Sequence, residues 1–156
     1  MKTLLYLTTA IMMISVVAFA GEGNLQKDTG YSFYTISDLS YEEALDKIPE
    51  ELKKEGFGIV SQLNVTETIK KKLDKDMRPY MILGACNPSF AFQALQAEEQ
   101  IGLMLPCNII VYVNEEGKTV ISAINPEAAM QAVDNEELSK IASEVSARLK
   151  KVIERL

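Results

Sequence analysis

The fold class is decided by residues 107–124, CNIIVYVNEEGKTVISAI. Residues 107–113 form a short apolar run that ends before a polar turn, which predicts a buried strand. The turn, NEEG at 114–117, places a glycine where a hairpin needs a positive φ. Residues 118–124 then return as the partner strand. Because consecutive strands joined by a tight turn pair antiparallel, the hairpin predicts an antiparallel or mixed sheet.

Strands and helices alternate through the rest of the chain. Three further strands are predicted at 32–36, 57–65 and 80–86, where β-branched and aromatic residues gather. Helices are predicted after Ser40, after Asn87, after Asn125 and over 136–156, with a short polar helix or turn at 66–76. The simplest closure lays one layer of helices on one face of the sheet. The predicted class is therefore a two-layer α+β domain.

Local signals mark where several of these helices begin and end. Ser40 and Glu43 have the spacing of a capping box, and Gly56 is placed to end the same helix. Pro49 lies within that helix and either kinks it or starts a second short one. Asn-Pro opens a helix at 87–88 and again at 125–126, with asparagine as the cap and proline in the first position. The predicted buried faces are Phe90, Ala91, Ala94 and Leu95 in the first of these helices, and Leu138, Ile141, Ala142, Val145, Leu149, Val152, Ile153 and Leu156 in the last.

Composition excludes several classes of function. The chain has 156 residues, which suits one domain, and a formal net charge of −6 without a basic stripe, so we expect no nucleic-acid partner. With no histidine, Ser-His-Asp and Cys-His nucleophilic sites are absent. The paired acids at 42–43, 50–51, 98–99 and 136–137 are interpreted as solvent-facing charge on helices. These features favour a non-enzymatic protein with no catalytic residues and no cofactor.

Residues 1–20, MKTLLYLTTAIMMISVVAFA, have the pattern of a signal peptide. One lysine precedes an uncharged run that ends in Ala18-Phe19-Ala20, and such a small-x-small ending favours cleavage before Gly21. The run just reaches the length of a membrane span, so a retained anchor is the alternative. We predict a signal peptide at 1–20, a flexible lead-in at 21–30 and a single domain at 31–156. The mature protein is then periplasmic or extracellular and has no stable membrane span.

The chain contains two cysteines, and each is followed by an asparagine, in Cys86-Asn87 and Cys107-Asn108. Cys86 ends one predicted strand and Cys107 begins the next. If these strands are antiparallel neighbours, both thiols lie at the same rim of the sheet; if the strands are parallel, the thiols lie at opposite ends. We predict that strands 80–86 and 107–113 are antiparallel neighbours, with helix 88–97 on the covered face.

Several states are open to two thiols at one rim. A disulfide that closes a loop of about twenty residues would add roughly 3 kcal/mol of stability. A reversible redox pair needs a lowered thiol pKa, which the helix start after Cys86 favours. A Cu(I) site needs thioether ligands such as Met81 or Met104, although strand alternation points Met81 away from Cys86. Buried cysteines without any chemical role are also common.

Longer stretches around both cysteines resemble a known family, the domain of unknown function 302 family of bacteria and archaea. The similarity lies in YEEALDKIPEELKKEGFGIVSQLNV at 41–65, RPYMILGACNPSFAFQAL at 78–95 and IGLMLPCNIIVYVNEEGKTVISAINPEAAM at 101–130, and it runs from about Tyr31 to the C-terminus. The matching motif positions are Gly84, Ala85, Cys86, Asn87, Pro88, Pro106, Cys107 and Asn108. The resemblance implies a TATA-binding-protein-like fold, with a curved antiparallel sheet of about five strands and helices on one face. It implies no established activity, and this chain departs from the pattern in its exported N-terminus and in Pro49.

We expect an exported, non-enzymatic domain that binds a small ligand at a rim formed by Cys86, Asn87, Pro88, Cys107 and Asn108. The two amides offer hydrogen-bond donors and acceptors, and the helix start at Pro88 offers free backbone N–H groups. Asn108 is a poor strand former where no cap is needed, which indicates a use for its amide. A thiol-redox or soft-metal protein that uses both cysteines is the alternative, and a protein–protein module that binds through the sheet face is a third. The partner is thus an unknown small ligand or protein.

Overall fold

The hairpin of residues 107–124 lies at the centre of one antiparallel sheet. The structure, a computed structural model, describes residues 27–156. Its strands are β1 (Lys27–Asp28), β2 (Ser32–Ser37), β3 (Gly58–Asn64), β4 (Tyr80–Cys86), β5 (Cys107–Val113) and β6 (Thr119–Ile124). Within the described residues they form one six-stranded sheet in the order β1-β2-β6-β5-β4-β3, in which every neighbouring pair is antiparallel. The five predicted strands are confirmed, and β1 adds a short edge strand from the segment predicted as a lead-in.

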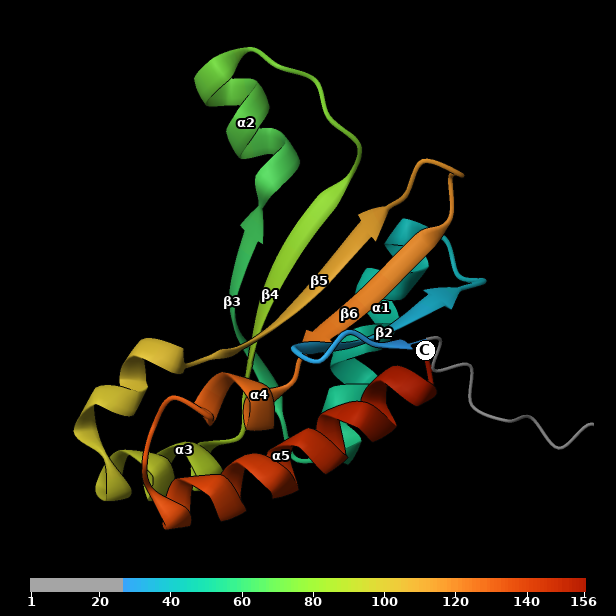
Figure 1. The fold of residues 1–156 in the computed structure, drawn as a ribbon. Helices are drawn as coiled ribbons and strands as arrows, with labels where there is room; N and C mark the ends of the chain where they lie inside the picture. The colour runs from blue at the N-terminus through green and yellow to red at the C-terminus, as the bar shows by residue number, and fades with distance from the viewer. Residues whose placement is uncertain (1–26) are drawn as a thin grey trace, which may run out of the picture.

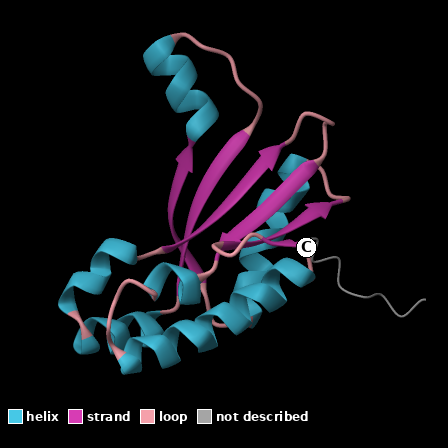
Figure 2. Cartoon of the chain, viewed as in Figure 1, coloured by secondary structure: helices cyan, strands magenta, loops and turns pink. Residues whose placement is uncertain are grey.

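All the described helices except α2 gather on one side and at one end of this sheet (Figure 1). The helices are α1 (Tyr41–Lys54), α2 (Val65–Leu73), α3 (Pro88–Ala97), α4 (Pro126–Met130) and α5 (Glu136–Glu154), with a 3-10 helix, η1 (Glu99–Met104), after α3. In Figure 1, α1 lies behind β5 and β6, while α5 runs across the lower end of the sheet with α3 and α4 beside it. Figure 2 shows α2 projecting away from the other helices, beyond the far end of the sheet. The arrangement is the predicted α+β class.

One face of the sheet forms the hydrophobic core with α1 and α5. Alternate residues of the central strands, such as Leu83, Ile109 and Ile121, are buried on this face. They belong to the same cluster as Ile48 and Leu52 of α1. Burial of each such side chain contributes about 1.5–3 kcal/mol relative to exposure, so this layer supplies most of the stability.

The long C-terminal helix confirms the 3.6-residue periodicity of the sequence. Its buried residues are Leu138, Ile141, Ala142, Val145, Ser146, Leu149, Val152 and Ile153. Seven of the eight predicted positions are therefore buried, and the eighth, Leu156, lies half-buried beyond the helix end. Ser146 is tolerated on this face because its hydroxyl donates to Asn125 Oδ1 at 2.8 Å.

The predicted caps are confirmed. Ser40 Oγ accepts from the Glu43 backbone N–H at 3.2 Å, and Glu43 Oε2 accepts from the Ser40 N–H at 2.8 Å. Gly56 follows α1 with φ +82°, a conformation that glycine adopts without strain. Pro49 lies inside α1, which runs through it without a break. Asn87 and Asn125 cap α3 and α4 with their side-chain oxygens, as the repeated Asn-Pro pairs predict.

The predicted buried face of α3 is only partly correct. Ala94 is buried, but the Leu95 side chain is 39% exposed. The prediction assumed that α3 lies over the sheet. The helix instead packs chiefly against α5 and η1 beyond the ends of the strands, so a narrower stripe is covered.

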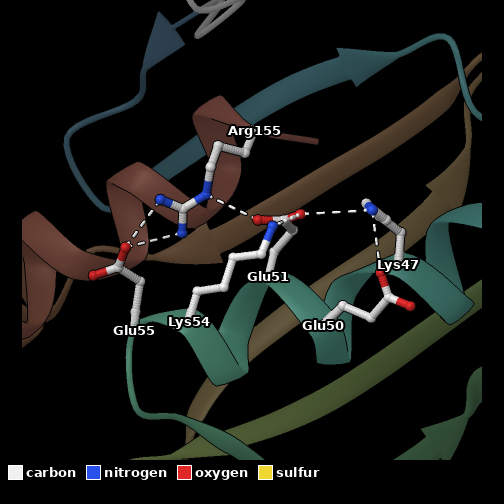
Figure 3. Close-up of polar contacts among 6 residues, drawn as sticks. All are labelled: Lys47, Glu50, Glu51, Lys54, Glu55 and Arg155. Atoms are coloured by element: carbon white, nitrogen blue, oxygen red, sulfur yellow. Dashed lines mark hydrogen bonds and ion pairs between the residues drawn. The ribbon is translucent and has the colours of Figure 1, made fainter.

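A buried carboxylate links α1 to α5, contrary to the interpretation of all paired acids as solvent-facing. The Glu51 side chain is 3% exposed and accepts from Lys54 Nζ at 2.7 Å and from Arg155 Nε at 2.9 Å. Figure 3 shows Arg155 between Glu51 and Glu55, and its guanidinium also contacts Glu55 at 2.9 Å. Lys54, followed by Arg155, holds the pKa of Glu51 below its ordinary value. Single-residue polarity could not predict this burial, because Arg155 is distant in sequence.

The opposite face of the sheet carries side chains that are not part of the core cluster. Ile82, Ile110 and Tyr112 are half-buried there, and the rings of Tyr80 and Tyr112 stack with centroids 5.5 Å apart. Among residues 27–156, no helix is both long and apolar enough to cross a membrane. The predicted signal peptide at 1–20 lies outside the described residues.

Candidate functional site

The pairing of β4 with β5 brings the two cysteines to one end of the sheet. The strands are antiparallel neighbours, with Ala85 opposite Cys107 and Gly84 opposite Asn108. Cys86 is the last residue of β4, and Cys107 is the first residue of β5. The predicted strand pairing is confirmed, and the two thiols lie at the same rim. Both cysteines are free thiols and both are half-buried.

A cavity of about 30 Å³ lies at this rim and is lined by both cysteines and by Asn87. The remaining lining is apolar and comes from Phe57, Ala85, Phe90, Ala91, Ala94, Leu105, Pro126, Met130, Ile141, Ala142 and Val145. Apart from Phe57, which precedes β3, and Leu105, which follows η1, the lining residues belong to the ends of β4 and β5 and to α3, α4 and α5, which converge here. Because one water molecule needs about 10–15 Å³ by this measure, the cavity holds a guest of atomic size.

The two motif asparagines have different positions. Asn87 Oδ1 accepts from the backbone N–H groups of Ser89 and Phe90, at 3.1 and 3.3 Å, and so caps α3. Its amide nitrogen also abuts Gly56, where an added Cβ would come within 2.9 Å of Nδ2. Asn108 is exposed, and neither it nor the exposed Pro88 is among the residues that line the cavity. The structure thus brings Cys86, Asn87 and Cys107 together at the cavity and leaves Pro88 and Asn108 outside it.

Gly84 and Pro106 have a packing role that the sequence did not reveal. A Cβ added to Gly84 would meet the Pro106 ring at 2.5 Å and would lie closer still to Ser61 Oγ. The Leu105–Pro106 peptide bond is cis. Ser61 lies opposite Gly84 in the pairing of β3 with β4. The motif glycine is therefore required because proline and serine side chains occupy the space beside it.

Burial governs the acidity of both thiols. Burial, with a smaller effect from Cys86, raises the pKa of Cys107 to about 11. Burial also raises the pKa of Cys86. The redox alternative needs a lowered thiol pKa, whereas burial raises the pKa of both thiols. Desolvation dominates, and the N–H groups at the start of α3 already bond to Asn87 Oδ1.

The site contains no ligand set for a hard metal ion. Among residues 27–156, no group of three or more histidine, cysteine, aspartate or glutamate side chains could hold a metal. Of the two thioethers considered from the sequence, Met81 packs against the core from within β4, and Met104 ends η1 with a 37% exposed side chain. The methionine that does line the cavity is Met130, at the end of α4.

The family model described as Domain of unknown function DUF302 matches residues 33–156, which include all of β2 except Ser32 and every element after it. The chain belongs to this family. A solved structure similar to this DUF302 chain is the crystal structure of an uncharacterized conserved protein DUF302 from Bacillus stearothermophilus. It is 30% identical, covers 80% of this chain and 96% of its own, and superposes with a TM-score of 0.75. No curated protein matches the chain.

The family assignment confirms the resemblance to this family, and the similar structure agrees with the α+β fold. In this DUF302 chain the motif positions 84–88 and 106–108 gather at one end of the sheet, although they come from separate strands. Gly84 and Pro106 pack together, Asn87 caps a helix, and the two thiols line the cavity. The motif therefore combines local structural roles at Gly84, Asn87 and Pro106 with two half-buried thiols beside the cavity, of which Cys107 also packs against the core.

Proposed function

We propose that this DUF302 domain is a non-enzymatic module that binds a small ligand at the cavity between Cys86 and Cys107. The observation that carries the proposal is the cavity itself, which adjoins both motif thiols and Asn87. The Asn87 side chain holds its wall of the cavity in place, because its Oδ1 caps the start of α3 and its Nδ2 lies beside Gly56. The exposed amide of Asn108 lies on the same strand as Cys107 and is not part of the proposed cavity site.

The thiol-redox alternative receives less support. A reactive cysteine is one whose thiol pKa is lowered, since the thiolate is the nucleophile. Here burial raises the pKa of both cysteines, and that of Cys107 reaches about 11. We therefore place binding ahead of thiol exchange.

The proposed binding function is tested by native mass spectrometry. The reduced protein is incubated with a small-molecule ultrafiltrate of the cells that produce it, and its mass is compared before and after denaturation. We expect an added mass at a 1:1 ratio that denaturation releases. The variant Cys86→Ser/Cys107→Ser should lose it, whereas Met104→Leu, whose side chain does not line the cavity, should keep it. A wild-type protein that carries no added mass would contradict the proposal.

We also propose that the domain acts after export. The support is in the sequence, where residues 1–20 combine an N-terminal lysine, an apolar run and the ending Ala18-Phe19-Ala20. Intact mass spectrometry of protein from the exporting cell should give a chain that starts at Gly21. A chain that keeps residues 1–20 and fractionates with membranes would instead identify the segment as an anchor.

A further inference from the structure

Three sulfur-bearing side chains line the same cavity. Cys86 ends β4, Cys107 begins β5, and Met130 ends α4 with only 8% of its side chain exposed. Because they come from three different elements, the folded chain is needed to bring them together. The other lining residues are hydrocarbon or aromatic, apart from Asn87, whose Oδ1 already accepts two backbone hydrogen bonds.

The volume and the lining restrict the guest. A cavity of about 30 Å³ admits a single water molecule or a single ion rather than an organic molecule. A buried water needs two to four polar partners, and this lining offers few. Hard cations such as Ca²⁺ need six or more oxygen ligands, and no carboxylate lines the cavity. Thiolate and thioether sulfur are instead the ligands that select Cu(I).

We propose that the cavity is a binding site for one Cu(I) ion, held by Cys86 Sγ, Cys107 Sγ and Met130 Sδ. The inference rests on the proposed binding function and names its ligand. On binding, the two thiols release their protons to solvent. Two thiolate–copper bonds and one thioether–copper bond form, and copper remains in the +1 state. The product carries one net negative charge.

The test is an anaerobic competition between the reduced protein and the chromogenic Cu(I) chelator bicinchoninate. We expect the wild-type protein to remove one equivalent of Cu(I) from the chelator. Cys86→Ser and Cys107→Ser should each weaken binding by more than the roughly 10- to 100-fold that loss of an outer-shell partner costs. Met130→Leu should raise the Kd for Cu(I) by about tenfold. X-ray absorption at the copper edge should show a shell of sulfur only, which loses one scatterer in Met130→Leu.

Met104→Leu is the matched control for Met130→Leu, since it makes the same change outside the cavity, and it should bind as the wild type does. Thermal unfolding of each variant checks that the fold is kept, and Met130→Leu tests the site even if a cysteine variant misfolds. A wild-type protein that takes no Cu(I), or a Met130→Leu variant that binds unchanged, overturns the inference. If Cu(I) does not bind while native mass spectrometry finds a different added mass, only this inference is overturned. If neither is found, the proposed binding function is overturned as well.

Discussion

Gly84 explains, at the scale of a single residue, why the GACNP and LPCN motifs occur together. The proline of one motif and Ser61 of β3 both lie where a Gly84 side chain would begin. The sequence identified Gly84 and Pro106 as motif positions through resemblance, but it could not assign their contact. The contact depends on the registers of β3, β4 and β5, which no local pattern contains.

We predict that Gly84→Ala destabilises the fold by about 1–3 kcal/mol, the usual cost of overpacking. The new methyl group would meet the Pro106 ring at 2.5 Å, and a proline ring cannot rotate aside. Gly58→Ala is the control, because nothing lies within 4 Å of its added Cβ. Urea denaturation measures both. Equal stabilities of the two variants would show that the β3–β4–β5 packing relaxes without cost.

The alkylation of Cys107 should rise steeply with pH. Only the thiolate reacts, and burial raises the pKa of Cys107 to about 11. Its reaction with iodoacetamide in the native protein should therefore rise about tenfold per pH unit through neutral and mildly alkaline pH. Peptide mapping after timed alkylation separates Cys107 from Cys86. A Cys107 rate that levels off near pH 8 would contradict the buried thiol and revive the redox alternative.

Replacing the two motif asparagines should have different effects on stability. Asn87→Ala removes the cap of α3, whose two hydrogen bonds are 3.1 and 3.3 Å long, and should cost about 1 kcal/mol. Asn108→Ala changes an exposed side chain and should alter stability by less than about 0.5 kcal/mol. Thermal unfolding of both variants provides the comparison. A large loss in Asn108→Ala would reveal a structural role that its exposure does not suggest.

At the scale of elements, local signals predicted most of the structure. The capping box at Ser40, the Asn-Pro helix starts and the periodicity of α5 are all encoded within a few turns of chain. The residues whose burial was predicted wrongly are those whose exposure depends on how the helices pack against the sheet and against each other. Leu95 is partly exposed because α3 lies beyond the strand ends, and Glu51 is buried because the end of α5 meets α1.

We predict that the link between α1 and α5 weakens in acid. The pKa of Glu51 is lowered in the folded state, so its stabilisation is present at neutral pH and is lost as the pH falls from about 4.3, the ordinary glutamate value, through the folded pKa. Glu51→Gln should cost about 1–2 kcal/mol at pH 7, near the lower end for charged hydrogen bonds because Lys54 and Arg155 are partly exposed. The variant should lose this part of the acid dependence, as measured by urea denaturation at several pH values.

Glu50→Gln is the matched control for that experiment. Glu50 is the preceding residue, its side chain is 66% exposed, and it contacts Lys47. Its replacement should leave both stability and acid dependence close to the wild type. If Glu50→Gln and Glu51→Gln behave alike, the buried position of Glu51 has no energetic consequence.

At the scale of the whole molecule, the sequence predicted an antiparallel sheet, one helical layer and the adjacency of the two thiols. It could not predict the cavity, because that space depends on how α3, α4 and α5 converge at the sheet end. Met130 illustrates the limit. It lies in a helix of only five residues, and its approach to the thiols depends on the path of the chain between β6 and α5.

Because the core lies on one face of the sheet, we predict that truncations on the two faces differ in their effect on stability. Leu149 of α5 is fully buried in that core, so Leu149→Ala should cost about 2–5 kcal/mol through lost burial and the cavity left behind. Ile110 is half-buried on the opposite face, outside the core cluster, and Ile110→Ala should cost less, about 1–2 kcal/mol. Urea denaturation should show both variants unfolding in one transition with similar dependence on urea, since each variant still unfolds the same sheet. Equal losses from the two variants would mean that a second layer covers the Ile110 face in solution.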